Sequence, residues 1–141
     1  MMKKLLCFFL VLAGIAGTGL KSVAATNNSV FTDTVRKKIV HPKTAMSDDD
    51  LTKILNKIRQ KRNDEEKIAT LKTEVTDKAL TVDQLITLLN QFLADDSKLE
   101  CAEYAFPYTT NYKTFLKIID LFSEEGYKNR LEDFYDKARK W

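Results

Sequence analysis

The chain has 141 residues, with 23 lysines and arginines, 20 acidic residues and a formal net charge of +3. Residues 1–25 hold three of the basic residues and no acid, so the rest of the chain carries 20 bases and 20 acids. A formally neutral chain sets up no long-range field, and we expect neither nucleic acid nor anionic lipid as a partner. Beyond residue 25 the only cysteine is Cys101, which excludes a disulfide within that part of the chain.

The first residues have the composition of an export signal. A basic start precedes an apolar run from Leu5 to Ala16, which is shorter than the roughly 20 residues of a membrane-spanning helix. Small residues follow up to Ala25, in the pattern that a signal peptidase cleaves. Because Cys7 precedes most of the apolar run, lipidation is the less favoured alternative. We expect a signal peptide over residues 1–25, cleaved after Ala25, an exported protein that is periplasmic or secreted, and no transmembrane segment in the mature chain.

Residues 26–46 show no sustained helical period. They combine small polar residues with a basic cluster and a His41-Pro42 pair. This composition is typical of a flexible arm or linker that contains at most one short extended piece. The basic cluster, Arg36 to Lys38, is a candidate second contact for a partner.

From residue 47 onward the apolar residues recur at helical spacing, and the pattern predicts about six short helices. The expected apolar stripes are Leu51–Ile58, Ile68–Val75, Val82–Phe92, Leu99–Phe106, Tyr112–Phe122 and Tyr127–Ala138. Capping residues mark the first three helix starts at Ser47, Asn63 and Thr81, and the last of these opens a capping box. Asp95 or Asp96 is expected to cap the fourth helix.

The predicted helices repeat as pairs. Three segments share an apolar-apolar-polar-x-apolar order, and they are Ile54–Ile58, Leu88–Phe92 and Ile118–Phe122. Each precedes a second helix, and the second helices align around Lys67, Lys98 and Arg130. A spacing of about 30 residues is that of a helical hairpin. The sequence therefore predicts an all-α domain over residues 47–141, built from three stacked hairpins.

The stretch from Thr81 to Tyr135 resembles a known family. The segments that match its order of features are "TVDQLITLLNQF", "DDSKLECAEYAFP", "NY" at 111–112 and "IIDLF". The family is an uncharacterised all-helical domain found in exported bacterial proteins and appended to some animal proline-rich proteins. The resemblance covers about residues 50–137, and it implies a fold without an established activity. That family often carries an aspartate before the Asn-aromatic pair, where this chain has Thr109-Thr110.

No catalytic set stands out in the sequence. Cys101 lies among apolar positions and far along the chain from the only histidine, His41, so we expect a buried thiol, with an intermolecular disulfide or a redox role as the alternative. One histidine does not supply the three or four ligands of a zinc site, so we expect no metal and no cofactor. Acids at helix starts are typical of capping, and they leave open a catalytic carboxylate pair.

Aromatic residues are the strongest indication of a function. Tyr104, Phe106, Tyr108 and Tyr112 cluster around one predicted turn between helices, and Trp141 follows the last helix. Core packing at the hairpin junction is the favoured interpretation for Phe106 and Tyr112. Since tyrosine and tryptophan are common interface anchors, the candidate partner-binding residues are Tyr108, Tyr104, Tyr112 and Trp141.

These features favour an exported, non-enzymatic helical domain that binds a protein or peptide. Stacked hairpins present an extended face that suits such a partner. Two alternatives stay open. A small carboxylate-dependent hydrolase acting on envelope polysaccharide predicts two acids from different helices in one pocket, and a purely structural envelope protein predicts no saturable partner.

Overall fold

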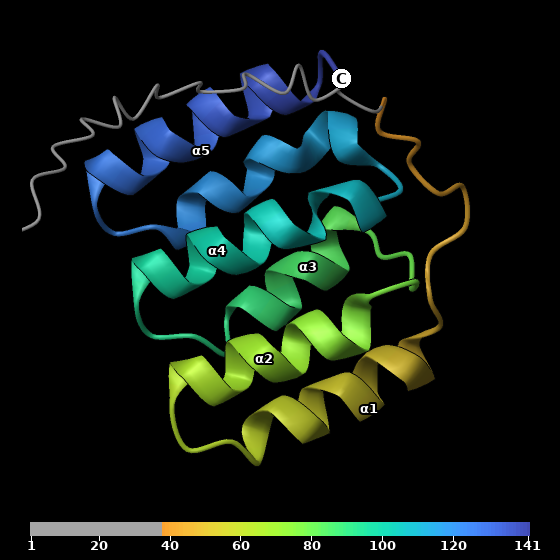
Figure 1. Ribbon diagram of the computed structural model, residues 1–141. Helices are drawn as coiled ribbons and strands as arrows, with labels where there is room; N and C mark the ends of the chain where they lie inside the picture. The colour runs from red at the N-terminus through yellow and green to blue at the C-terminus, as the bar shows by residue number, and fades with distance from the viewer. Residues whose placement is uncertain (1–37) are drawn as a thin grey trace, which may run out of the picture. The chain divides into compact units, whose positions relative to one another are not determined.

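The computed structural model describes residues 38–141. The predicted signal peptide with Ala25, and the predicted arm up to residue 37, lie outside the described residues. The helices are α1 (Asp48–Arg59), α2 (Asp64–Val75), α3 (Val82–Leu89), α4 (Asp95–Ala105) and α5 (Glu125–Ala138), with two 3₁₀ helices, η1 (Phe106–Tyr108) and η2 (Tyr112–Leu121) (Figure 1). Within residues 38–141 the only β-type pairing is an isolated bridge between Leu80 and Thr109. The all-α prediction is confirmed.

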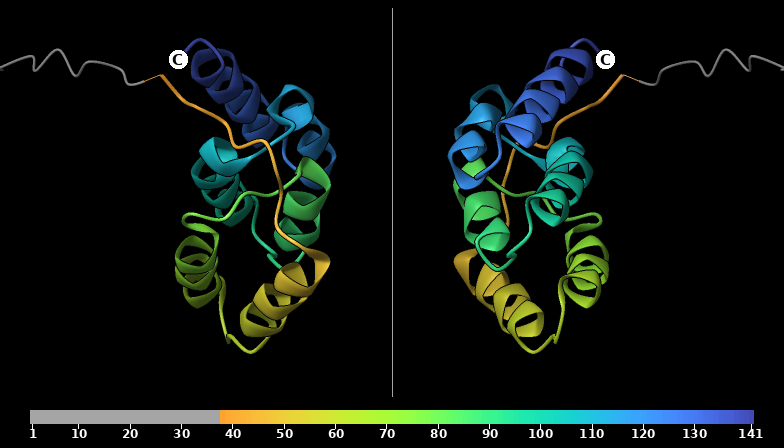
Figure 2. Two further views of the ribbon diagram at one scale, coloured as in Figure 1. Left: turned by 90° about the vertical axis from the view of Figure 1, so that its right-hand side faces the viewer. Right: turned by 90° about the vertical axis from the view of Figure 1, so that its left-hand side faces the viewer.

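The helices pair into hairpins, and the hairpins stack in two layers. One layer holds the second helix of each hairpin, and in it α4 contacts both α2 and α5. The other layer holds the first helices, and there α3 contacts η2. Figure 2 shows the two layers from the side, and buried side chains from both layers form one core cluster. The predicted stack of three hairpins is therefore confirmed.

Side-chain caps form at the first three helix starts, as predicted. Ser47 accepts the N–H of Asp50, and the Asn63 side chain accepts the N–H of Glu66. Thr81 and its N3 partner complete a capping box, with both reciprocal hydrogen bonds present. Each cap satisfies a main-chain donor that the first helical turn leaves without an acceptor.

The predicted cap of α4 is wrong. The helix begins at Asp95, its N-cap residue is Ala94, and that residue makes no side-chain capping bond. The Asp96 carboxylate accepts the N–H of the next residue, Ser97, at 2.7 Å. Asp95 does not cap its own helix because its carboxylate is directed to the next hairpin.

Asp95 and Lys98 connect the second hairpin to the third, and we call this contact the second clamp. Asp95 Oδ2 accepts the main-chain N–H groups of Ser123 and Glu124 at 2.7 and 2.9 Å. Asp95 Oδ1 accepts from Lys98 Nζ at 2.9 Å, and Nζ also donates to the carbonyl of Leu121 at 2.8 Å. The two side chains are only 6% and 11% exposed, so this ion pair is nearly buried.

The first clamp repeats this arrangement between the first and second hairpins. Asp64 Oδ2 accepts the N–H groups of Leu93 and Ala94 at 3.1 and 3.2 Å. Lys67 Nζ donates to Asp64 Oδ1 at 3.2 Å and to the carbonyl of Gln91 at 2.8 Å. In both clamps the first residue of one helix therefore binds the start of the helix that follows in the same layer.

The third hairpin carries the same two positions without the clamp. Glu125, the first residue of α5, pairs with Lys128 at 3.3 Å, and the glutamate side chain is 75% exposed. Lys128 is thus the counterpart of Lys67 and Lys98, and the predicted counterpart, Arg130, is out of register by two residues. The alignment failed because an aliphatic residue after a basic one recurs at several helical positions.

The predicted helix after Asn111 is a 3₁₀ helix of ten residues. One row of apolar residues, Tyr112, Phe115, Ile118 and Leu121, recurs at every third position, which is the period of a 3₁₀ helix, and Leu116 and Ile119 lie beside it. The same residues also fit the i, i+3 part of an α-helical stripe. The sequence pattern therefore indicated a helix without showing its type.

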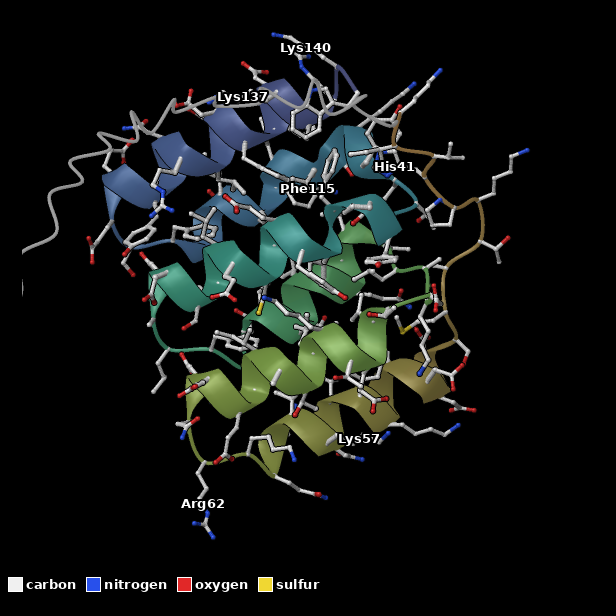
Figure 3. All side chains as sticks on the ribbon, in the orientation of Figure 1. His41, Lys57, Arg62, Phe115, Lys137 and Lys140 are labelled. Atoms are coloured by element: carbon white, nitrogen blue, oxygen red, sulfur yellow. The ribbon has the colours of Figure 1, made fainter. Side chains whose placement is uncertain are left out.

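Phe106, the first residue of η1, lies at the centre of an aromatic core. Its ring meets those of Phe115, Phe134 and Tyr135 edge to face at centroid distances of 4.9, 5.5 and 6.0 Å. Phe106 and Phe115 are both fully buried, and Figure 3 shows Phe115 in the interior. Phe106 therefore fills the hairpin junction, as the sequence predicted.

The two ends of the stack are polar. Lys57 and Arg62 of the first hairpin, and Lys137 and Lys140 of the last, extend away from the core (Figure 3). Polar outer faces are typical of the terminal units of a helical stack. Among residues 38–141, no helix combines the length and apolarity needed to cross a bilayer.

Residues 38–46, which we call the strap, have no helix but have fixed contacts. The Ile39 N–H donates to the carbonyl of Trp141 at 3.1 Å, and the Met46 N–H donates to the carbonyl of Ala79 at 2.6 Å. The side chains of Ile39 and Met46 pack against the core. The strap follows the edge at which α2, α4 and α5 end (Figure 1). The segment predicted as a flexible arm thus includes a docked stretch.

Candidate functional site

A groove of about 330 Å³ lies beside Tyr108, at the edge that the strap follows. The lining residues are Val40, Pro42, Asp77, Lys78, Ala79, Pro107 and Tyr108. Most of them are apolar, and they come from the strap, from the turn after α2 and from η1. We call this site the Tyr108 groove.

Main-chain hydrogen bonds fix two walls of the groove relative to each other. The Leu80 N–H donates to the carbonyl of Tyr108 at 3.0 Å, and the Thr110 N–H donates to the carbonyl of Leu80 at 2.9 Å. Between them Thr109 is fully buried, and its hydroxyl donates to the carbonyl of Ala105. The turn after α2 and the end of η1 therefore form one rigid unit.

His41 fixes the third wall, the strap. Its ring stacks on Tyr112 at a centroid distance of 3.8 Å and meets Phe106 edge to face at 4.9 Å. Nδ1 lies 3.0 Å from the carbonyl oxygen of Thr109 and donates to it. Burial lowers the pKa of His41, although the hydrogen bond to Thr109 acts in the opposite direction. The docked imidazole is therefore the neutral form at neutral pH, and its contacts with Thr109, Tyr112 and Phe106 hold the strap on the domain.

Val40 is exposed although its neighbours on the strap are docked. Its side chain is 84% exposed and lines the groove. The residues on either side of it, Ile39 and His41, both contact the folded domain. The strap thus presents an apolar side chain to solvent from a fixed backbone.

Tyr104 and Tyr108 lie side by side, as the sequence predicted from their clustering. Their ring centroids are 5.8 Å apart and their planes are tilted by 42°. The Tyr104 hydroxyl is hydrogen-bonded to Thr76 at 2.6 Å, and Lys72 Nζ lies 5.4 Å from the Tyr104 ring centroid. Burial, and then the neighbouring Tyr104 side chain, raise the pKa of Tyr108. Tyr108 therefore keeps its hydroxyl proton at neutral pH.

Of the four candidate residues only Tyr108 lines the groove, and Tyr104, Tyr112 and Trp141 lie outside the lining. Tyr112 is half-buried under His41, and the carbonyl of Trp141 accepts the N–H of Ile39. Both residues hold the strap in place. The structure brings Tyr104 and Tyr108 together and gives Tyr112 and Trp141 positions along the docked segment.

Cys101 is fully buried in α4, as expected. Burial, with a smaller effect from Glu100, raises the pKa of its thiol to about 12. The thiol is therefore protonated at neutral pH, where a nucleophile needs the thiolate. Among residues 38–141, no group of three or more His, Cys, Asp or Glu residues is placed to hold a metal ion.

One hollow brings together acids from two helices. Glu103 of α4 and Asp133 of α5 line a space of about 280 Å³, together with Arg130, Phe134 and Lys137. Burial raises the pKa of Glu103, while Arg130 lowers it in part. For the clamp acids Asp64 and Asp95 burial acts to raise the pKa, but main-chain N–H groups and a lysine lower it overall. Of these acids, Glu103 is the one whose pKa is raised.

A larger hollow, of about 420 Å³, lies on the outer face of α1 and α2. Its lining consists mainly of long polar side chains such as Lys57 and Glu74, which pair with each other at 2.7 Å. Ligand sites are usually lined by apolar and aromatic side chains with a few polar groups. The Tyr108 groove fits that description better.

Sequence reasoning identified Tyr108 alone among the seven lining residues, and the residues that it missed include Val40, Pro42 and Asp77. The first two belong to a segment without helical period, and its docking depends on contacts with residues far along the chain. Asp77 did leave a signal, since it follows the C-cap residue of α2, where glycine is the usual residue. Aspartate tolerates the left-handed backbone less well than glycine, so its presence at such a position is a reason to look for a further role.

No match was found among curated proteins or among solved structures. A family model described as a domain of unknown function, DUF4476, matches residues 45–135. The match runs from the end of the strap through most of α5, and it overlaps nearly all of the stretch over which the sequence resembled an uncharacterised helical family. Since it covers well over half of the 141 residues, the chain belongs to this family of domains of unknown function, DUF4476.

Proposed function

We propose that this chain is an exported, non-enzymatic domain that binds a protein or peptide through the Tyr108 groove. The observation that carries the proposal is Val40, which is 84% exposed beside Tyr108 on a strap with a fixed backbone. A fixed apolar site is suited to binding because little conformational entropy is lost when a partner docks. Tyr108 adds a ring that buries apolar area and a hydroxyl that donates a hydrogen bond.

The contact is best tested with the exported, processed protein crosslinked in native cell envelope. We expect one partner to be recovered at near-equal amounts with wild type and to be lost with Tyr108→Ala. Tyr127→Ala is the matched control, because Tyr127 is also a half-buried tyrosine but lies at the start of α5 and outside the groove lining. Equal recovery with both variants would contradict the proposed site.

Export is part of the proposal, and it rests on the composition of residues 1–25. N-terminal sequencing of the protein recovered from periplasm or medium should give Thr26 as the first residue. Protein that stays in the cytoplasm with Met1 intact would contradict it.

A carboxylate-dependent hydrolase is the second candidate, because Glu103 and Asp133 line one hollow from different helices. It predicts that purified protein releases soluble fragments from envelope polysaccharide and that Glu103→Gln abolishes the release. The same hollow holds Arg130 and Lys137, which offset both negative charges. We favour binding, since carboxylates next to basic side chains have a ready explanation as surface ion pairs. A purely structural envelope protein would show neither turnover nor a saturable partner.

A further inference from the structure

Asp77 stands at a position after α2 where glycine would be more stable. It follows the C-cap of α2 and has φ 64°, in the left-handed region where glycine or asparagine is the usual residue. Its carboxylate also lies at the C-terminal end of a helix, where the helix dipole disfavours negative charge. Both effects act against stability. Backbone strain of this kind is a reason to look for a function at the residue.

The charge of Asp77 has no partner within the described domain. Its carboxylate forms no hydrogen bond and no ion pair with any of residues 38–141. The other charged residue of the groove lining, Lys78, lies 3.7 Å from Glu74, which also pairs with Lys57 at 2.7 Å. Lys72 nearby pairs with Glu100 at 2.6 Å. The groove therefore presents one exposed carboxylate that forms no ion pair of its own.

An aromatic ring accompanies this charge. Asp77 and Tyr108 line the same groove, and the carboxylate adds to the effects that raise the pKa of that tyrosine. A ring face attracts cations, and Lys72 already lies over the neighbouring Tyr104 ring at 5.4 Å. Of the two neighbouring tyrosines, Tyr108 is therefore the one whose ring face can take a cation from a partner.

We propose that the Tyr108 groove binds a lysine or arginine side chain of its peptide partner, held between the Asp77 carboxylate and the Tyr108 ring. An apolar residue next to that cation in the peptide packs on Val40 and Pro42. This inference rests on the proposed function, and it adds the chemical class of the partner. Since the chain beyond residue 25 is formally neutral, the recognition is local and depends on this one carboxylate.

The test uses four peptide libraries as probes, alike except for a fixed central lysine, arginine, norleucine or glutamate between randomised apolar and small polar flanks. Binding to the processed full chain is followed by the NMR shifts of the Ala79 and Tyr108 amides. We expect the lysine and arginine libraries to bind about tenfold more tightly than norleucine, the sum of a modest ion pair and a cation–π contact. Asp77→Asn should reduce that preference to less than about twofold.

The asparagine in that variant keeps the shape of the side chain and tolerates the left-handed backbone, so loss of folding does not confound the result. Asp83→Asn, at the exposed start of α3, is the control for removal of one negative charge elsewhere. A cation preference that survives Asp77→Asn, or a preference for norleucine or glutamate that Tyr108→Ala abolishes, would overturn the partner class while leaving the groove as the binding site. Wild-type protein that binds none of the libraries would overturn the proposed function as well.

Discussion

The two clamps and the Tyr108 groove lie at opposite ends of the layer formed by α2, α4 and α5. At the starts of these helices, each clamp acid binds two main-chain donors and one lysine, and every one of those groups has a partner. At the ends of the helices, Val40 is exposed and Asp77 has neither a paired charge nor a favourable backbone conformation. The same layer thus follows the rules of stable packing at one end and departs from them at the other.

The two ends therefore differ in what their residues contribute to stability. The clamp residues stabilise the fold, whereas Asp77 in the groove lowers its stability. Removing a clamp acid leaves two main-chain N–H groups and a lysine without their acceptor, whereas replacing a groove residue with a better helix terminator removes an unfavourable feature. Departures from local preference are expected at functional sites, where another requirement has decided the residue. Mutations at the two ends should therefore change stability in opposite directions.

The largest effect is expected for Asp95→Ala in the second clamp. The change leaves Lys98 nearly buried without its carboxylate and removes the acceptor of the Ser123 and Glu124 N–H groups. Breaking a buried ion pair of this kind lowers the free energy of unfolding by about 3–5 kcal/mol. Guanidinium unfolding of the purified protein measures the loss.

Glu125→Ala is the matched control for that variant, because Glu125 occupies the same helix position in the third hairpin but its pair with Lys128 is exposed. Its free energy of unfolding should change by less than about 1 kcal/mol. Equal losses in the two variants would mean that the clamp geometry contributes nothing beyond a surface ion pair.

A smaller effect is expected at the strap, where His41→Ala removes one stacked ring and one hydrogen bond. Together these contacts stabilise docking by about 1–2 kcal/mol. The expected result is faster amide exchange and faster proteolysis within residues 38–46, while the circular dichroism of the helices stays unchanged. Loss of helical signal in this variant would show that the strap is part of the folding unit.

The docking of the strap should also depend on pH, with a sign set by burial. Burial lowers the pKa of His41 from its ordinary value of 6.5, so below that pH the undocked chain binds more protons than the docked one. The stabilisation is complete above about pH 6.5 and is lost as the pH falls from there through the lowered pKa. His41→Phe keeps a ring in the stack, cannot titrate, and should give docking that is independent of pH in this range.

The sequence predicted the helices and hairpins because those features depend on residues close together in the chain. Ser47, Asn63 and Thr81 cap helices whose donors lie within three residues, so their roles could be deduced from spacing alone. Asp95 shows the limit of that reasoning. Its donors, Ser123 and Glu124, are 28 and 29 residues away, and a neighbour at such a distance is known only once the hairpins are stacked.

The residues of the candidate site also fall into those that could be predicted from nearby sequence and those that could not. Tyr104 and Tyr108 are one turn apart, and the sequence predicted that they cluster with Phe106 and Tyr112 around one turn between helices. The strap was not, because His41 lies 68 residues from the Thr109 carbonyl that it binds. Docking of an irregular segment leaves no periodic pattern, so the two strap residues of the groove lining, Val40 and Pro42, could not be identified before the fold was known.

The smallest and most informative effect is expected at Asp77, where substitution should stabilise the protein. Asp77→Gly relieves the left-handed backbone conformation and removes a negative charge from the end of α2. Glycine at such a position is favoured over other residues by about 1 kcal/mol, and the dipole contributes a few tenths more. Thermal unfolding should therefore shift upward, in contrast to every clamp variant. If Asp77→Gly were instead destabilising, the carboxylate would have a structural role, and its unpaired charge would no longer point to a partner. A gain in stability combined with a loss of binding would show that this end of the layer was selected for recognition at the expense of packing.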